Sequence, residues 1–421
     1  MNHFSDLIGY AEEKIELERI CDILKNTEKY RALGVSAPKG LLIDGKPGLG
    51  KTLAAQDLAK ASERKVFCCR KDKSDGDFVN EIRETFEKAK AETPSIVFLD
   101  DMDKFANEDE RHRNAEEFVT VQSCIDGCKD LDVFVLATAN ETHCLPASLL
   151  RAGRFDKILT FTSPKFEDAV EIVRFYLGKK KFVAEVDVEE ITRILSGRSC
   201  AELETVINEA GILAGFANKT RIDMDDIVKA CLRVIFNAPE SVNTDSSCVK
   251  KVAYHEAGHA LVQDILEPGS VNLVSVAAYS GSIGGVASCS QAENYFKEKK
   301  YMENRVKCIL AGRAATELVF GTTDVGAGSD LRRAFSIVER FVDNYCSYGF
   351  WMFSDNSVGT EVANRKDFAL SMEMERYYSE TKRIIIENRE YLEKIVEALL
   401  EKKTLLRKDL AEIRAAVTAA A

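Results

Sequence analysis

The sequence has no apolar stretch long enough to cross a membrane. Its most apolar segments, at 95–99 and 132–139, are far shorter than the ~20 residues that a transmembrane helix needs. The first residues, MNHFSDLIGYAEEK, have neither the positive charge nor the apolar core of a signal peptide. We therefore expect a cytoplasmic protein or, if the chain was cut from a longer one, the cytoplasmic face of a membrane-anchored protein. Met1 is compatible with a genuine start, and the three final alanines are either native or a cloning remnant.

A basic patch, an internal repeat and a low-complexity segment are also missing. The chain has 58 basic and 69 acidic residues and a formal charge of −11, so its charge gives no support to a nucleic-acid partner. With 421 residues, 45% of them hydrophobic and 30% charged, its composition is that of a globular protein. At ~100–200 residues per domain, this length predicts roughly two to four domains.

The 12 cysteines include no Cys-x-x-Cys pair. A cysteine-containing chain of this length without a signal peptide is typical of a reduced cytosolic protein. Cys124 and Cys128 lie four residues apart on a predicted helix, and His143 and Cys144 follow. Two interpretations are open, a structural zinc site or buried free thiols, and the second is the commoner fate of such cysteines.

Strands and helices alternate in the first 160 residues. The apolar, β-branched runs that predict buried strands lie at 40–44, 65–69, 95–101 and 132–138, and helices are predicted at 52–63 and 77–92. Strand–helix alternation of this kind predicts a parallel sheet covered by helices.

The remaining sequence is mainly helical in pattern. Residues 165–236 predict a small helical domain, and residues 237–247, rich in Pro, Asn, Ser and Thr, predict a linker. Residues 270–290 interrupt the helical pattern that follows with glycines and alternating small or β-branched residues, which predict a hairpin or a short sheet.

A glycine-rich loop separates the first predicted strand from the helix after it. It fits the phosphate-binding pattern G-x-x-x-x-G-K-[ST] with Gly45, Lys46, Pro47, Gly48, Leu49, Gly50, Lys51, Thr52 and, in the helix, Leu53. Glycines let backbone N–H groups curl around phosphate oxygens, and the helix aims its positive end at the same anion. Lys51 should reach the β- and γ-phosphates of a nucleotide, and Thr52 should bind Mg²⁺.

Two aspartates close the strand predicted at 95–101. A carboxylate at the end of a buried strand can hold Mg²⁺ through water, a role that we assign to Asp100. Asp101 would then orient or deprotonate the attacking water. The alternative is that either aspartate only caps the following segment, but the phosphate-binding loop upstream favours the functional role.

The second half of the chain contains the pattern H-E-x-x-H at His255, Glu256 and His259. Histidines four residues apart share one face of a helix, so both can bind one Zn²⁺. Glu256 can accept a proton from the zinc-bound water, which then attacks a polarised carbonyl. Gly258 lowers the stability of this helix by ~1 kcal/mol relative to alanine. A functional helix tolerates that cost where another group must approach its backbone closely. Two histidines on an ordinary helix are the alternative, but chance gives this pattern with a probability of only about one per cent in such a chain.

Several segments resemble the FtsH family of AAA zinc metalloproteases, from Phe4 to about residue 400. They are FSDLIGYAEEK, APKGLLIDGKPGLGKTLAA, FEKAKAETPSIVFLDD, LLRAGRFDK, AGRAATELVFG and DVGAGSDLRRAF. The resemblance implies an α/β AAA ATPase module, with a parallel sheet flanked by helices, at 1–160 and a small helical lid domain at 161–237. A linker at 238–248 and a mainly α-helical zinc peptidase domain at 249–421 would follow. The family's N-terminal membrane-spanning part has no counterpart.

The resemblance also implies roles in binding ATP with Mg²⁺. Ile8 and Gly9 match the adenine-binding stretch, Asn140 matches the polar sensor of the γ-phosphate, and Ala201 matches the small sensor position of the lid. The arginines of the finger motif, which act across a subunit boundary and imply a homohexameric ring, are Arg151 and Arg154.

A catalytic zinc takes three ligands from the protein, and no histidine follows at the metzincin spacing. In the peptidase domain the resemblance supplies the third ligand. The matching residue is Asp330, which could also be a helix N-cap. Glu317 matches a carboxylate that orients a zinc-bound histidine. Residues 281–289 would form an edge strand that receives the backbone of a substrate.

Two departures from the family pattern concern the ATPase. Asp101 stands where the family usually has glutamate. The segment that should carry an aromatic–hydrophobic–glycine pore loop, KDKSDGDFVNEI, is shorter and lacks the glycine pattern. Phe78 and Val79 are the only pair that could grip substrate there, and a position in a helix core is the alternative.

Together these features predict an ATP-dependent zinc metalloendopeptidase that unfolds, translocates and degrades unfolded or misfolded polypeptides. Two alternatives stay open. One is an AAA remodelling ATPase with impaired hydrolysis or translocation, and the other is a peptidase whose ring is only held together by nucleotide.

Overall fold

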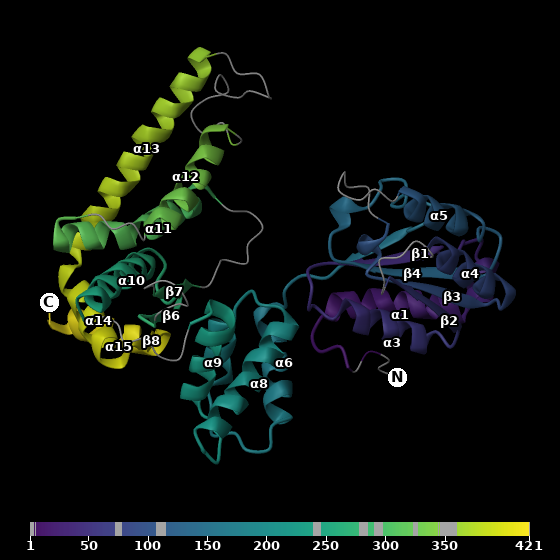
Figure 1. Ribbon diagram of the computed structural model, residues 1–421, viewed down its shortest axis with the longest axis horizontal. Helices are drawn as coiled ribbons and strands as arrows, with labels where there is room; N and C mark the ends of the chain where they lie inside the picture. The colour runs from purple at the N-terminus through teal and green to yellow at the C-terminus, as the bar shows by residue number, and fades with distance from the viewer. Residues whose placement is uncertain are drawn as a thin grey trace. The chain divides into compact units, whose positions relative to one another are not determined.

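The computed structural model describes residues 4, 6–71, 78–106, 115–238, 246–277, 285–289, 298–322, 327–343, 345 and 360–420. The chain forms two compact units, the first comprising Met1–Val183 with Gly197–Asn208 and the second Ala184–Ser196 with Glu209–Ala421. Figure 1 colours the chain by residue number, from purple at the N-terminus to yellow at the C-terminus. None of the helices in these ranges is both long and apolar enough to span a bilayer.

The first unit is built on a parallel sheet. Its strands are β1 (Gly40–Asp44), β2 (Lys65–Arg70), β3 (Ser95–Asp100), β4 (Val133–Ala139) and β5 (Lys157–Thr160), in the order β2-β3-β4-β1-β5. Each neighbouring pair is parallel, and β3 and β4 are buried along their whole length. The first four strands confirm the prediction. The sequence misses β5 because it has only four residues, most of them exposed.

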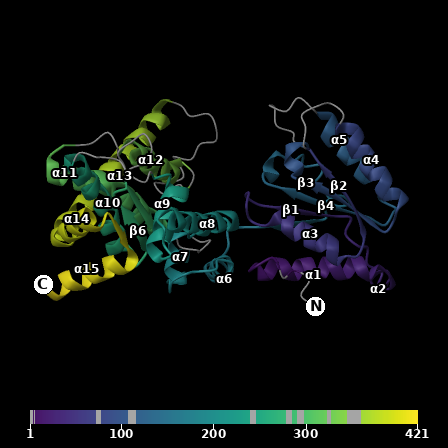
Figure 2. The same cartoon turned by 60° about the horizontal axis from the view of Figure 1, so that its bottom comes forward.

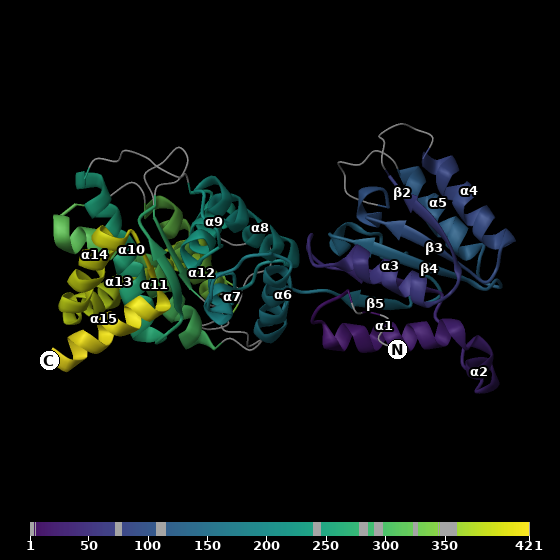
Figure 3. The same ribbon diagram turned by 90° about the horizontal axis from the view of Figure 1, so that it is seen from below.

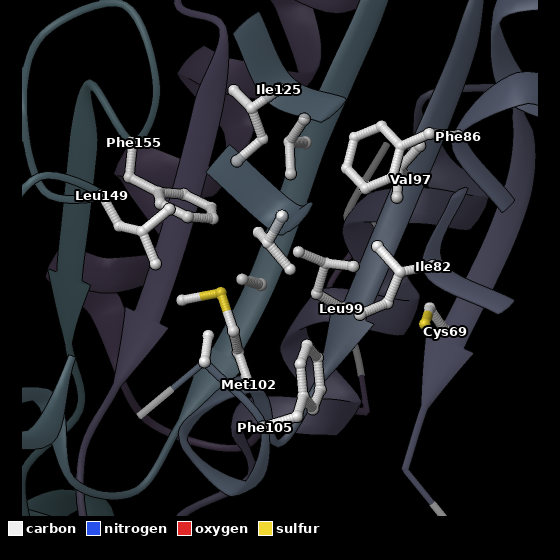
Figure 4. Close-up of a cluster of buried hydrophobic side chains, with 14 of the residues drawn as sticks. Cys69, Ile82, Phe86, Val97, Leu99, Met102, Phe105, Ile125, Leu149 and Phe155 are labelled. Carbon is white, nitrogen blue, oxygen red and sulfur yellow. The ribbon is translucent and has the colours of Figure 1, made fainter. Parts of the chain in front are cut away.

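Helices cover both faces of this sheet, as a parallel sheet requires. On one face lie α1 (Ala11–Lys25) and α3 (Lys51–Ala61), and on the other α4 (Phe78–Ala91) and α5 (Ala115–Asp126), as Figures 2 and 3 show. Figure 4 shows the apolar cluster under α4 and α5, which includes Ile82, Phe86, Val97, Leu99 and Ile125. This unit also contains α2 (Thr27–Ala32), η1 (Met102–Lys104), η2 (Thr142–Cys144) and, after β5, α6 (Phe166–Gly178).

Phe78, proposed above as a pore residue, belongs to this cluster. It is only 6% exposed and packs edge-on against Phe105, with ring centroids 5.0 Å apart. Because a residue that grips substrate must be accessible to it, the pore interpretation of Phe78 is wrong and the alternative, a core position, is confirmed. Val79 is half-buried beside it, and residues 72–77 of the same segment lie outside the described residues.

The helices predicted for the lid form as expected, but both units contain parts of this region. α7 (Val188–Ile194) and α9 (Met224–Phe236) belong to the second unit, and α8 (Cys200–Phe216) has residues in both. The domain boundaries predicted from the sequence therefore stay predictions.

The rest of the second unit is mainly helical. Helix α10 (Ser246–Leu266) packs against α11 (Lys299–Phe320) and α14 (Arg389–Lys402), and α11 packs in turn against α12 (Gly328–Asp343) and α13 (Thr360–Glu387). Apolar side chains of α10, α11 and α14 form one cluster, and those of α11, α12 and α13 form another. This packing fixes α10 and α12, which carry the candidate zinc ligands, against α11.

A small antiparallel sheet lies beside α10, in the order β7-β6-β8. β6 (Val271–Ser275) and β7 (Val286–Cys289) confirm the sheet predicted at 270–290. β8 (Thr404–Leu406) comes from the junction between α14 and α15 (Arg407–Ala420). Three residues carry no detectable strand pattern, so the sequence does not predict β8.

The burial of Phe78 is testable by truncation. Phe78→Ala should lower the free energy of unfolding of the first unit by about 3–5 kcal/mol, the usual cost of removing a buried phenylalanine side chain. Urea denaturation measures the change. The control is Phe182→Ala, at a side chain that is 66% exposed, which should change stability by less than about 0.5 kcal/mol. A Phe78→Ala protein as stable as its parent would contradict the core assignment.

Candidate functional sites

The loop between β1 and α3 has the backbone of a phosphate-binding loop. Gly45, Gly48 and Gly50 have φ angles of 139°, 77° and 90°, which side chains disfavour. At Gly45 a Cβ would also lie only 2.2 Å from the Phe161 carbonyl oxygen. Of the intervening residues, Lys46 and Pro47 are exposed, Leu49 is buried and Leu53 is half-buried. Because α3 begins at Lys51, its free N–H groups face the loop, as anion binding requires.

Lys51 lies at the centre of the polar contacts behind this loop. Its Nζ donates hydrogen bonds to the Lys46 carbonyl and to Asn140 Oδ1, both at 2.8 Å. Burial lowers the pKa of the ammonium group, although nearby carboxylates such as Asp101 oppose the shift. A bound phosphate would compensate the buried charge.

The two predicted Mg²⁺-binding residues meet at the end of the sheet. Thr52 Oγ1 donates to Asp100 Oδ1 at 3.1 Å, and Thr138 Oγ1 donates to the same oxygen at 2.8 Å. Arg70 Nη1 lies 3.2 Å from the other oxygen of Asp100. The hydroxyl of Thr52 and the carboxylate of Asp100 are the oxygen ligands that Mg²⁺ prefers.

Asp101 follows β3 in the left-handed conformation, with φ 53°, which costs a non-glycine residue of order 1–3 kcal/mol. Its Oδ2 accepts from Lys104 Nζ at 2.6 Å, and its Oδ1 accepts from Asn140 Nδ2 at 3.3 Å. Burial works to raise the pKa of Asp101, but these bonds outweigh it and lower the pKa. The residue is therefore a carboxylate at neutral pH, able to orient a water molecule or accept its proton.

The other residues assigned to ATP binding lie around the same loop. Asn140 bonds both Lys51 and Asp101. The Ala201 N–H donates to the Gly48 carbonyl at 3.0 Å, so the start of α8 lies against the loop. Gly9 is in the left-handed region with φ 71°, and Ile8 is half-buried. Their individual roles stay predictions.

The two arginines of the finger motif differ in their surroundings. Arg154 is paired within its own chain, since Nε and Nη2 donate to the two oxygens of Asp126 at 3.1 and 2.8 Å. Arg151 is exposed. To act on the nucleotide of a neighbouring subunit, Arg154 would have to break its hydrogen bonds to Asp126 or keep only some of them. The finger role of both arginines therefore stays a prediction.

Cys124 and Cys128 do not form a zinc site. Among the described residues, two groups bring three metal-ligand atoms together, and neither includes these cysteines. Both instead pack in or against the cluster shown in Figure 4, and burial raises the pKa of the Cys128 thiol to about 11. The interpretation as free thiols is confirmed and the zinc interpretation of this pair is wrong.

His255 and His259 on α10 meet Asp330 on α12. The two Nε2 atoms are 3.2 Å apart, and Asp330 Oδ2 lies 3.3 Å from His255 Nε2 and 3.4 Å from His259 Nε2. Around a tetrahedral zinc with ligands at ~2.0–2.1 Å, neighbouring ligand atoms are about 3.3–3.4 Å apart. The three residues thus fit one face of the tetrahedron and leave the fourth position for water or substrate, as in catalytic zinc sites.

A backbone carbonyl, and not Glu317, holds His259. The Nδ1 of His259 is 2.7 Å from the Cys308 carbonyl oxygen, which directs Nε2 toward the metal position. The Glu317 carboxylate instead accepts hydrogen bonds from Tyr378 and Lys382. Glu317 therefore does not orient His259, and its expected role toward His255 stays a prediction.

Glycines allow α10 and α11 to approach closely at the ligands. A Cβ on Gly258 would lie 2.6 Å from the Ala311 carbonyl oxygen, which confirms the close approach expected there. A Cβ on Gly312 would lie 2.5 Å from His259 Nε2 and 2.6 Å from His255 Nε2. Sequence reasoning missed Gly312, although it lies in the segment AGRAATELVFG.

Glu256 is buried next to the two histidines. It is 7% exposed, and burial raises the pKa of its carboxyl group against the opposing effect of both imidazoles. The N–H of Gly285, just before β7, also faces this carboxylate. A raised pKa suits a group that must accept a proton and then release it near neutral pH. Residues 281–284 of the expected edge strand lie outside the described residues. β7, the described part of it, is an edge of the small sheet as far as that sheet is described, which suits the expected contact with substrate backbone.

Comparisons with known proteins give one family match in each part of the chain. Residues 41–163 match the model of the ATPase family associated with various cellular activities (AAA). Residues 243–413 match that of peptidase family M41.

Curated relatives match along nearly the whole chain. Over 97% of its length the chain is 32% identical to ATP-dependent zinc metalloprotease FtsH 2 of Phytoplasma mali, covering 62% of that protein. It is 30% identical over 96% of its length to FtsH 3 of Synechocystis, and 31% identical over 97% to FtsH 2 of Thermoanaerobacter, covering 71% and 82% of them. The chain spans about three-fifths of the length of relatives such as the Phytoplasma mali protein. The chain has an ATPase match followed by a peptidase match, and it aligns over 96% and 97% of its length with these last two relatives. It therefore belongs to the FtsH family of ATP-dependent zinc metalloproteases.

Proposed function

We propose that this chain is an ATP-dependent zinc metalloendopeptidase acting on unfolded or misfolded polypeptides. The observation that carries the proposal is the arrangement of His255, His259 and Asp330, whose ligand atoms are separated by the edge lengths of a zinc tetrahedron. The buried carboxylate of Glu256 beside them supplies the base. Relatives named as ATP-dependent zinc metalloproteases support the same activity.

The peptidase step follows from the positions of these side chains. When bound, zinc polarises the scissile carbonyl and lowers the pKa of water. Glu256 accepts the proton of the attacking water and then donates it to the leaving amine, as a general base and acid. The Cys308 carbonyl holds the His259 ring in place during this exchange, and β7 offers its backbone to align the peptide.

The ATPase step depends on the edge of the sheet in the first unit. Lys51 and the loop glycines bind the phosphates, Thr52 and Asp100 hold Mg²⁺, and Asp101 orients the attacking water. Arg151 and Arg154 would complete the site of a neighbouring subunit, so this mechanism includes a homohexameric ring. Hydrolysis in such a ring would feed polypeptide to the peptidase sites.

A second candidate is a peptidase whose ring is only held together by nucleotide. The burial of Phe78 favours it, because the described residues of this segment provide no exposed aromatic side chain to pull substrate. Casein degradation with ATP, with ADP and with a non-hydrolysable analogue separates the candidates. We expect degradation with ATP alone, whereas equal degradation with the analogue would establish the second candidate.

The zinc assignment predicts a split between metal binding and activity. His255→Ala and Asp330→Ala should each lose one zinc per chain, because two ligands hold the ion poorly. Glu256→Gln should keep that zinc and lose peptidase activity by about 10²–10⁴-fold, the usual contribution of a general base. Metal analysis and peptide hydrolysis measure the two effects, and Glu387→Gln, at a glutamate whose side chain is 62% exposed, is the matched control. A His255→Ala protein with the zinc content of its parent would refute the assignment.

Asp101 generates a prediction about rate. Its carboxylate falls short of a glutamate carboxylate by about 1.5 Å, one carbon–carbon bond, and a ~1 Å misplacement can cost ~10²-fold in rate. Asp101→Glu should therefore speed ATP turnover, and Asp101→Asn should nearly stop it, while ATP affinity changes little in both. Steady-state ATPase rates and nucleotide titrations decide. A slower Asp101→Glu enzyme would mean that the left-handed backbone and the bonds to Lys104 and Asn140 have adapted the site to aspartate.

A further inference from the structure

The turn after β4 gathers three metal-binding side chains outside the sites described above. The ligand atoms of Glu141, His143 and Cys144 all lie within 4.8 Å of one another. Cys144 Sγ is 3.4 Å from Glu141 Oε2, and His143 Nε2 is 3.8 Å from the same oxygen. Glu141 and His143 are exposed and Cys144 is half-buried, so an ion could enter from solvent.

These distances are close to those of a tetrahedral zinc site. With Zn–S at ~2.3 Å and Zn–O at ~2.0–2.2 Å, sulfur and oxygen ligands are about 3.5–3.7 Å apart. The separation between Cys144 and Glu141 already has nearly this value. Nitrogen and oxygen ligands are about 3.3–3.5 Å apart, so a small rotation of the exposed His143 ring would bring its Nε2 to this distance from Glu141.

Hydrogen bonds hold the backbone of the turn before any ion binds. The Cys144 N–H donates to the Glu141 carbonyl at 3.2 Å, and the Leu145 N–H donates to the Thr142 carbonyl at 3.0 Å. Thr142 Oγ1 donates to Asp44 Oδ2, at the end of β1, at 2.7 Å. The backbone therefore has little conformational entropy left to lose when the three ligands close on a metal, and the main cost is ordering the exposed side chains of Glu141 and His143.

We propose that Glu141, His143 and Cys144 bind a divalent transition-metal ion, Zn²⁺ under ordinary conditions. A thiolate, an imidazole and a carboxylate together suit zinc, whereas Mg²⁺ and Ca²⁺ prefer oxygen ligands alone. On binding, the Cys144 thiol releases its proton to solvent and its sulfur bonds the metal in place of the hydrogen bond to Glu141. With three protein ligands, the fourth position belongs to water.

The site adjoins the candidate ATPase site. Asn140, which bonds Lys51 and Asp101, immediately precedes the ligand Glu141. A bound ion would hold this residue in place and so couple metal availability to ATP turnover. That coupling rests on the proposed ATPase function, but the binding of the metal does not, and it can be tested by itself.

Cobalt(II) distinguishes this site from the peptidase site. The peptidase ligands are nitrogen and oxygen, so of these two sites only the one that contains Cys144 can give the near-ultraviolet charge-transfer absorption of a thiolate–cobalt bond. We expect the metal-free full chain to bind two cobalt ions and to develop this absorption. Cys144→Ser should bind one ion and lose the absorption, and His255→Ala should lose the other ion and keep it.

Cys68→Ser is the matched control, since Cys68 is an exposed cysteine of the same unit, and it should behave as the parent does. A parent chain that binds a single cobalt ion would overturn the proposal, as would thiolate absorption that persists in Cys144→Ser. Failure of the proposed peptidase function would appear separately, as unchanged cobalt binding in His255→Ala.

Discussion

The peptidase half of the molecule depends on how closely α10 and α11 can approach. The axes of packed helices are usually ~8–10 Å apart, depending on the size of the side chains between them. Beside His255 and His259, the facing positions of α10 and α11 are glycines, which have no side chain. Gly258 faces the backbone of α11, and Gly312 faces the two imidazoles. Because the helices touch there, a main-chain carbonyl can reach His259, and its position is set by secondary structure, which is more rigid than a side chain. The same packing of α11 against α12 brings Asp330 to the histidines.

In the other half, the equivalent constraint is the order of the strands. β3, β4 and β1 are neighbours in the sheet, although long helical segments separate them in the chain. Their carboxyl ends present Asp100, Asn140 and the phosphate-binding loop at one edge, which is where ligands bind in parallel sheets of this kind. The hydrogen bonds among Lys51, Asn140 and Asp101 are the direct result.

The sequence predicts those parts of both sites that depend on neighbours along the chain. The glycine loop, the pair of aspartates and the H-E-x-x-H pattern each lie on one element, so spacing alone indicates their geometry. Asp330 lies far from the histidines in sequence, and only a resemblance to a family suggested it. The partner of His259 had no signal, because any residue at position 308 offers a carbonyl. For Phe78 the sequence left two interpretations, and its contact with Phe105, a residue from a different element, decides between them. β5 and β8 are too short to show a pattern, and their neighbours in the sheets define them.

The small sheet beside the zinc ligands has edges at β7 and β8, with four and three residues in the described part of the chain. An edge strand exposes unpaired backbone groups, and short edges limit the pairing of separate molecules that leads to aggregation. A similar limit would apply to substrate if it pairs with β7 as proposed. The four described residues of β7 would provide few main-chain hydrogen bonds to a peptide, so cleaved fragments would dissociate quickly from them, and a longer pairing would hold products more tightly at the expense of the next cycle.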